Sequence, residues 1–207
     1  MRIVSLEPAF EPLFWEHVNQ DIPYYYFFAF DWKYNREETR ILLALRENQI
    51  EGMMVVYRQS IVQLRGSQEA VKNLLERLDL EKIELQALEQ HKPYVLEKYK
   101  SIATHEMMLM VLRKGEESLH TKHSVFKLDA SDAEQIATAM IRADPEFWGT
   151  VTSQNIVEGV NRGVKWLGIK ANRELVSIGN VRLTEWGGLI GVAATHEAHR
   201  NKNLHPT

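Results

Sequence analysis

Histidine pairs are the first residues in this sequence whose type and spacing could do chemistry. His120 and His123 lie three residues apart, and so do His196 and His199. Two histidines supply half of a zinc site, which needs four donors or three donors and a water. No obvious third ligand occurs elsewhere, and cysteine is absent. We therefore expect no metal site, no disulfide and no thiolate chemistry, and we interpret His196 and His199 as loop residues.

A short acidic and aromatic segment is the second candidate. Asp144 and Glu146 stand beside Phe147 and Trp148. Carboxylates next to aromatic rings could hold an amine through ion pairing and cation–π contact. The alternative interpretation is a loop whose aromatic side chains fill the core. Glu185 is a further carboxylate, in a turn where solvation is the simpler reading, and the sequence identifies no catalytic base or acid.

The segment from Gly188 to Thr207 carries the most specific pattern. An apolar, strand-like stretch leads into a loop with an arginine at Arg200. This arrangement resembles the cofactor segment of the GNAT superfamily of acetyl-CoA-dependent N-acyltransferases, in which a strand precedes Arg/Gln-x-x-Gly-x-Gly/Ala and a helix. The matching positions here are Arg200, Asn203 and His205, so both small residues of the family pattern are replaced.

The resemblance implies a binding mode for acetyl-CoA. A loop of backbone N–H groups would hold the pyrophosphate, and free backbone groups of the strand would pair with the extended pantetheine arm. Asn203 tolerates left-handed geometry better than most residues, whereas Pro206 removes an N–H. The cofactor-binding positions that the resemblance implies are Val192, Ala193, Ala194, Arg200, Asn201, Lys202 and Asn203.

The function implied is transfer of acetyl from acetyl-CoA to an unidentified amine, which could be a small molecule, a protein N-terminus or a lysine. The replaced glycines, and the lack of the later helix and its usual tyrosine acid, lead us to expect impaired activity. The alternative is a non-catalytic GNAT-like binding or scaffold protein. A third reading is a two-layer α/β protein without any connection to CoA, with Arg200 to Lys202 as a solvated basic tail.

Composition is that of an ordinary globular protein. The chain has 207 residues, of which 44% are hydrophobic and 26% charged, with a net charge of −3. This charge gives no general attraction to nucleic acid or to anionic membranes. No signal peptide or membrane-spanning stretch is recognisable. We expect a cytoplasmic protein without nucleic-acid or membrane partners.

A polar stretch from Arg113 to His123 is interpreted as a linker between two domains, at residues 1–114 and 122–207. In the second domain, Ser131 and Glu134 form a predicted capping box for a helix. The expected order there is strand, helix, helix and three strands, which matches the first half of a GNAT domain. The strands and helix that carry this prediction are Ser124–Leu128, Ser153–Arg162, Val164–Lys170, Leu175–Leu183 and Leu189–Thr195.

The first domain has a similar predicted order, with a helix starting at Ser67 and a closing strand at Met107–Leu112. Glu47–Gly52 can be overlaid on Asn172–Ser177, and Arg65–Ser67 falls near the end of the cofactor strand. The sequence therefore predicts an α+β fold of mixed, mostly antiparallel twisted sheets flanked by helices. We interpret the chain as a tandem of two GNAT-like halves, the second incomplete.

An incomplete second half has a physical consequence. The strand Leu189–Thr195 would lie at a sheet edge with unpaired N–H and C=O groups, which invite pairing with another chain. We therefore expect a homodimer through this strand, aggregation, or support of the second half by the first.

Overall fold

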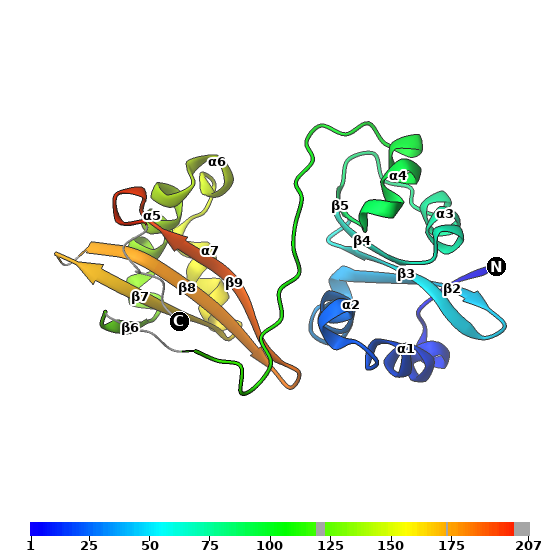
Figure 1. Cartoon of the computed structure of the whole chain (residues 1–207), viewed down its shortest axis with the longest axis horizontal. Helices are drawn as coiled ribbons and strands as arrows, with labels where there is room; N and C mark the ends of the chain where they lie inside the picture. The colour runs from blue at the N-terminus through cyan, green and yellow to red at the C-terminus, as the bar shows by residue number, and fades with distance from the viewer. Residues whose placement is uncertain (119–122, 173, 201–207) are drawn as a thin grey trace. The chain divides into compact units, whose positions relative to one another are not determined.

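A computed structural model describes residues 1–118, 123–172 and 174–200 of the chain (Figure 1). The chain divides into two compact units, Met1–Val111 (unit 1) and Leu112–Thr207 (unit 2), and each is described by itself. Together they hold seven α-helices among the described residues, and none of these helices is long and apolar enough to cross a lipid bilayer.

Unit 1 is built on a five-stranded mixed sheet in the order β1-β2-β3-β4-β5. The first four strands are antiparallel to their neighbours, and β5 is parallel to β4. Its elements are β1 (Arg2–Ser5), η1 (Pro8–Phe10), α1 (Glu11–Val18), α2 (Ile22–Tyr34), η2 (Arg36–Glu38), β2 (Thr39–Arg46), β3 (Gln49–Tyr57), β4 (Ile61–Gly66), α3 (Gln68–Glu76), β5 (Glu84–Gln86), η3 (Glu89–His91) and α4 (Lys92–Lys98).

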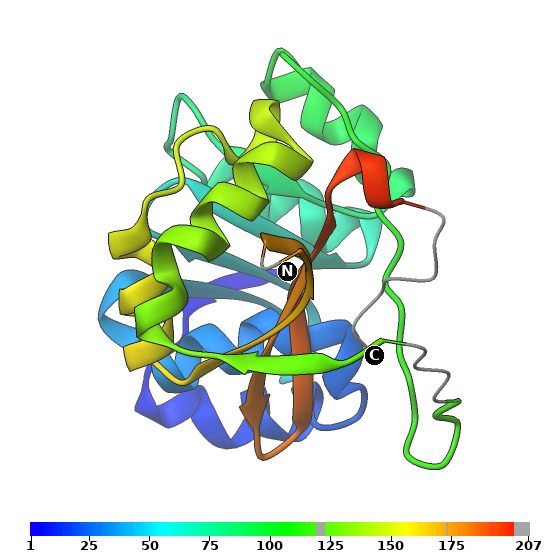
Figure 2. The ribbon, with the colours of Figure 1, turned by 90° about the vertical axis from the view of Figure 1, so that its left-hand side faces the viewer.

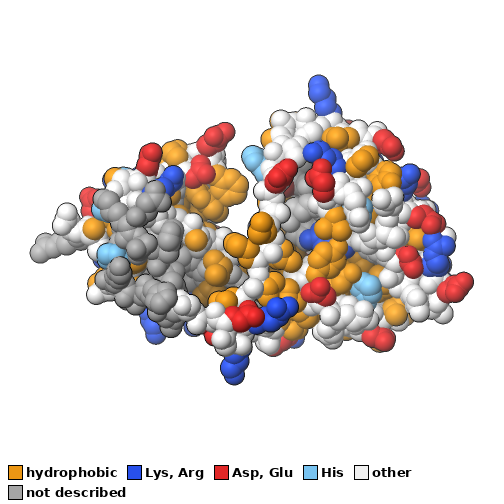
Figure 3. Space-filling model, in the orientation of Figure 1, with side chains coloured by type: hydrophobic (Ala, Val, Ile, Leu, Met, Phe, Trp, Pro, Cys, Tyr) orange, Lys and Arg blue, Asp and Glu red, His pale blue; other side chains and the backbone are white. Residues whose placement is uncertain are grey.

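Helices cover both faces of this sheet, with α1 and α2 on one side and α3 and α4 on the other (Figure 1). The central strands are therefore apolar on both faces, as expected for doubly covered strands. Leu43 and Met53 are fully buried on one face, and Leu64 and Leu74 are fully buried on the other. On the outer surface, acidic and basic side chains are interspersed rather than gathered by sign (Figure 3).

Unit 2 has a four-stranded antiparallel sheet in the order β6-β7-β8-β9. Its helices lie on one side of the twisted sheet, where Figure 2 shows them in yellow-green beside the orange strands. Its elements are β6 (Val125–Leu128), η4 (Ala130–Asp132), α5 (Ala133–Ala143), α6 (Pro145–Trp148), α7 (Ser153–Asn161), β7 (Val164–Ala171), β8 (Glu174–Thr184), β9 (Gly187–Thr195) and η5 (Glu197–His199).

The core of unit 2 forms between α5 and the sheet. Ile136 from α5 is fully buried against Trp166, Ile178 and Val192, which come from the three longest strands. The spacing of Ile136, Ala137 and Met140 along α5 gives the helix one apolar face, which the sheet covers. The predicted α+β class and the predicted element order of this unit are confirmed.

Two local predictions are wrong. The capping box lies two residues earlier than expected, because the carboxylate of Asp129 accepts from the N–H and hydroxyl of Ser131 at 2.8 and 2.6 Å, while Asp132 accepts from the Asp129 N–H. The predicted strand Met107–Leu112 is irregular and exposed. Its apolar residues favour a strand, but no neighbouring strand pairs with it among the described residues.

The hairpins β2–β3 and β7–β8 have the same arrangement, a turn with positive φ followed by a bulge. Glu47 and Asn48 form the first turn with φ of 50° and 64°, and Asn172 lies in the second with φ of 50°. Just after each turn the register shifts by one residue, which leaves Glu51 and Val176 bulged. These positions coincide in the overlay that the sequence suggests.

Candidate functional site

The outer strand of the unit 2 sheet, β9, contains a second bulge that is held by one side chain. The carboxamide oxygen of Asn180 on β8 accepts hydrogen bonds from the N–H groups of Gly191 and Val192, at 3.1 and 3.0 Å. The register shifts at this point, between Gly179 and Val181. A Cβ on Gly191 would lie 2.7 Å from the Asn180 oxygen, so glycine is required for this approach.

The bulge fixes which backbone groups of β9 face outward. The N–H of His196 donates to the carbonyl of Val176 at 2.9 Å. Because the groups of an antiparallel strand alternate in direction, Ala194 also faces β8, and Ala193 and Thr195 face away from it. Ala193 is exposed and offers both its N–H and its C=O at this edge.

Of the three strand residues named by the sequence, only Ala193 therefore presents a donor and an acceptor outward. Val192 is buried in the core, and its N–H is engaged by Asn180. Ala194 pairs with Ile178 across the ladder. An extended ligand with one amide group could pair with Ala193 as a further strand would.

The guanidinium of Arg200 links the end of β9 to the end of α5. Its Nε donates to the Thr195 carbonyl at 3.1 Å, and its Nη2 donates to the Ala143 carbonyl at 2.7 Å. Ala143 is the last residue of α5, where a cation is favoured by the helix dipole. Two of the guanidinium nitrogens are thus occupied by protein, and only Nη1 has no partner among the described residues. The other implied phosphate-loop residues, Asn201, Lys202 and Asn203, lie outside them, as do His205 and Pro206.

The two loop histidines adjoin this arginine. The Nδ1 atom of His196 accepts from the N–H of Ala198 at 3.2 Å, so the imidazole caps the short η5 turn. The ring of His199 lies edge-on to it, with centroids 5.9 Å apart. No group of three metal-ligating side chains occurs in the part of the chain that the structure describes. His123 is among those residues, and His120 is not.

The acidic and aromatic segment forms the short helix α6, in which one aromatic ring packs on the core and the other is exposed. Trp148 packs against the core, while Phe147 remains 70% exposed with its ring 4.5 Å from that of Trp148. The Asp144 carboxylate caps the helix by accepting from the Phe147 N–H at 3.0 Å. Glu146 and Phe147 are therefore the members that a ligand could contact.

Glu185 lies at the other end of β9. It occupies the turn between β8 and β9 and is exposed. Ala193 follows it by eight residues, a span of about 27 Å along an extended strand. Glu185 therefore cannot act on a group bound at Ala193.

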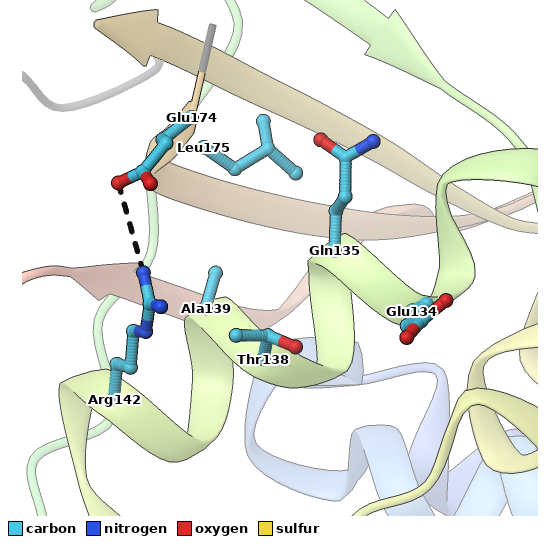
Figure 4. A pocket seen from close by; sticks show the side chains of 7 residues that line it. All are labelled: Glu134, Gln135, Thr138, Ala139, Arg142, Glu174 and Leu175. Carbon is cyan, nitrogen blue, oxygen red and sulfur yellow. Dashed lines mark ion pairs between the residues drawn. The ribbon is translucent and has the colours of Figure 1, made fainter. Parts of the chain in front are cut away.

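A shallow hollow opens between α5 and the start of β8 (Figure 4). Two of its charged members, Arg142 and Glu174, form an ion pair at 3.7 Å. Both side chains are more than half exposed, so solvent screens this pair. The residues that line the hollow are Glu134, Gln135, Thr138, Ala139, Arg142, Glu174 and Leu175.

Comparison with known proteins places the fold. Protein-family models and curated proteins gave no match to the chain. Among solved structures, a Drosophila melanogaster protein aligns with a TM-score of 0.54 at 12% identity, over 98% of this chain and 80% of its own. The fold is GNAT-like. Such a low identity shows the fold alone.

Two N-acetyltransferases align with less than half of the chain. The ribosomal-protein-alanine N-acetyltransferase of Brucella melitensis biovar Abortus 2308 aligns with 38% of this chain at 21% identity and a TM-score of 0.32. The PaiA N-acetyltransferase of Thermoplasma acidophilum, solved with coenzyme A, aligns with 40% at 11% identity and a TM-score of 0.33. The match spans 60% and 64% of the length of these two enzymes.

Asn180 and its role at the bulge were not predicted from the sequence. Its only local signal is an amide residue inside an apolar strand, near a glycine in the next strand.

Proposed function

We propose that this protein is an N-acyltransferase of GNAT type, which transfers acetyl from acetyl-CoA to an amine. The observation that carries the proposal is the outward-facing Ala193 next to the Asn180 bulge. The pantetheine arm is an extended chain whose amides carry one donor and one acceptor each. Pairing with Ala193 would satisfy both and would direct the thioester along β9. The GNAT-like fold supports this reading.

In this function the amine nitrogen attacks the thioester carbonyl carbon and the carbon–sulfur bond breaks. CoA leaves as its thiolate, and the proton lost by the amine nitrogen protonates that thiolate, directly or through water. The acceptor approaches from α6, where Glu146 and Phe147 offer a charge and an exposed ring to a cation. The acceptor is a small amine, a protein N-terminus or a lysine.

The tandem arrangement belongs to the same proposal. The two GNAT-like units cover residues 1–114 and 122–207, and the matching turns and bulges of β2–β3 and β7–β8 support a shared origin. The proposal assigns the cofactor to the open edge of β9 in unit 2. In unit 1 the equivalent strand, β4, runs directly into helix α3 at the cap Ser67.

A second candidate is a non-catalytic GNAT-like binding or scaffold protein. It is favoured by Arg200, because a guanidinium that braces two carbonyls has fewer donors for pyrophosphate. In this case the open edge of β9 pairs with β9 of a second copy, forming a homodimer. Acetyl-CoA and the second copy would then compete for Ala193, and neither nucleic acid nor membrane is needed as a partner.

Calorimetric titration with acetyl-CoA, with free CoA as a control for the acyl group, tests the first candidate. We expect saturable binding. Ala193→Pro removes the outward N–H without breaking a ladder bond, and should weaken binding about tenfold. Ala193→Gly keeps the N–H and should bind as the parent does.

Equal weakening in both variants, or no heat with folded protein, would refute the cofactor site. Sedimentation of the same protein then tests the scaffold candidate. A dimer that Ala193→Pro dissociates and Ala193→Gly does not would support pairing through β9, whereas a monomer at all concentrations would exclude it.

A further inference from the structure

Arg65 is a half-buried arginine of unit 1 that has no acidic partner among the described residues. It is the next-to-last residue of β4, and its Nη1 donates to the carbonyl of Leu64 at 2.9 Å. Its Nε is buried without a hydrogen-bond partner, and no carboxylate of the described residues pairs with it. Burial lowers the pKa of Arg65, as expected for a guanidinium withdrawn from water.

Two other arginines of unit 1, unlike Arg65, each have a carboxylate partner. Arg36 lies over the Trp32 ring at 4.3 Å and forms an ion pair with Glu11 at 2.5 Å. Arg58 lies over a tyrosine ring at 4.9 Å and is bonded to both carboxylate oxygens of Glu38, at 2.9 and 3.1 Å. Each combines a ring with a carboxylate, and the carboxylate neutralises the guanidinium.

Arg65 lies over an aromatic ring but has no carboxylate partner among the described residues. Its guanidinium carbon lies 5.0 Å from the Tyr24 ring centroid. The ring of Tyr25 packs edge-on against Tyr24 at 4.7 Å, and its hydroxyl bonds to His17 at 3.0 Å. Helix α2 is kinked at Tyr25, with φ of −103° and ψ of 15°. The kink brings both tyrosines to the end of β4.

The groups around Arg65 favour an anion. His91 is fully buried on the same side, and its Nε2 bonds to the Gly66 carbonyl at 3.0 Å. The carboxylate of Asp21 accepts from the Tyr24 N–H at the start of α2. Nε and Nη2 of Arg65 and the hydroxyl of Tyr24 have no hydrogen-bond partner among the described residues.

We propose that Arg65 and Tyr24 form a binding site for a small carboxylate. The Nε–Nη2 edge of a guanidinium matches the two oxygens of a carboxylate, as Arg58 and Glu38 show in the same unit. The Tyr24 hydroxyl supplies a third donor from the side. The bound carboxylate takes the place that Glu11 and Glu38 hold beside the other two arginines. This site is independent of the cofactor edge in unit 2.

Nuclear magnetic resonance of the arginine Nε–H groups tests the proposal on the full chain, with sodium acetate as the probe. The Arg65 signal should move saturably as acetate is added, while the signals of Arg36 and Arg58 stay in place because their carboxylates are already bound. Tyr24→Phe keeps the ring and removes the third donor, and should weaken acetate about tenfold. Arg65→Lys should abolish the saturable shift.

Three results would overturn the proposal. One is an Arg65 signal that does not move with acetate, and another is an equal shift at all three arginines, which would mean non-specific salt effects. The third is saturation by inorganic phosphate but not by acetate, since a tetrahedral anion would then be the ligand. The Nε shift is measured in the parent protein, so the test remains valid if Arg65→Lys fails to fold.

Discussion

The two units have similar central hairpins. They differ at the end of the strand that follows each hairpin, which is β4 in unit 1 and β9 in unit 2. In unit 1 the N–H of Ser67 donates to the bulged Glu51 carbonyl, and in unit 2 the N–H of His196 donates to the bulged Val176 carbonyl, each at 2.9 Å. Ser67 then caps helix α3, whereas His196 caps the single turn η5. The same strand end thus leads to a packed helix in one unit and to a short turn with Arg200 in the other.

One facing pair of residues accounts for this difference. In unit 1 the pair is Gly52 and Gly66, and a Cβ on Gly52 would lie 2.7 Å from the Cβ of Ala70 on α3. In unit 2 the pair is Ser177 and Thr195, whose buried hydroxyls bond to each other at 2.9 Å. Glycine allows a helix to approach the strand ends, whereas the hydroxyl pair fills the space with side chains.

The largest effect is expected from giving unit 1 a side chain at this pair. In Gly66→Ala the new Cβ would lie 2.3 Å from the Gly52 Cα, at a φ of +129° that disfavours alanine. We expect a loss of roughly 3 kcal/mol in the stability of unit 1. Amide hydrogen exchange in β3 and β4, compared with β8 and β9, measures the two units separately.

Gly187→Ala is the matched control. Gly187 has a φ of +134°, but nothing lies within 4 Å of its Cβ position. The control should cost only the backbone strain, about 1 kcal/mol, and in unit 2 alone. Equal losses from the two substitutions would mean that strain rather than close approach sets the glycine requirement.

The hydroxyl pair of unit 2 should be less costly to disrupt. Thr195→Val leaves the buried Ser177 hydroxyl without its strongest partner, and a loss of about 1–2 kcal/mol in unit 2 is expected. Ser177→Ala combined with Thr195→Val removes both polar groups and should recover part of that loss. Chemical unfolding of Thr195→Val, Ser177→Ala and the double variant gives the coupling energy, and strict additivity would contradict a direct bond.

The sequence predicts the parts of the fold that depend on local chemistry. Ser67 is the helix cap that its residue type indicates, and most strands begin within two residues of the predicted positions. It does not predict the contacts that arise from register or from distant pairing. The Asn180 bulge depends on which residues of β9 face it, and Arg200 reaches the carbonyl of Ala143, 57 residues away.

Met107–Leu112 shows the converse error. A run of apolar residues favours a strand, yet a strand also requires a partner whose backbone groups are free. No strand among the described residues pairs with this segment, and its side chains are between 48% and 82% exposed. Propensity alone therefore overestimates structure at positions where no strand pairing forms.

Substitution of Arg200 tests whether its hydrogen bonds stabilise unit 2 at the strand end where unit 1 has a helix. Arg200→Met removes both hydrogen bonds and the favourable charge at the end of α5, and should cost unit 2 about 1 kcal/mol. Arg142→Met, in the exposed ion pair of Figure 4, is the control and should change stability by less than about 0.5 kcal/mol. Thermal unfolding distinguishes the two variants. If Arg200→Met is as stable as the parent protein, a role of the guanidinium in ligand binding is favoured.

The smallest expected effect is a pH dependence in unit 1. Burial lowers the pKa of His91 from its ordinary value of 6.5, and the nearby Arg65 charge lowers it further. The unfolded state then takes up a proton at a higher pH than the folded state does, so this stabilisation is present above pH 6.5 and is lost as the pH falls through the folded pKa. Hydrogen exchange at pH 7.5 and pH 6 should show weaker protection of β4 at the lower pH.

His91→Gln isolates this contribution. A glutamine amide can still donate to the Gly66 carbonyl, but it does not titrate. The variant should therefore lose part of the pH dependence while it keeps α3 packed against β3. His17, whose pKa burial also lowers, accounts for the remainder. An unchanged pH dependence in His91→Gln would locate the acid sensitivity of unit 1 at His17 and the kinked helix α2 instead.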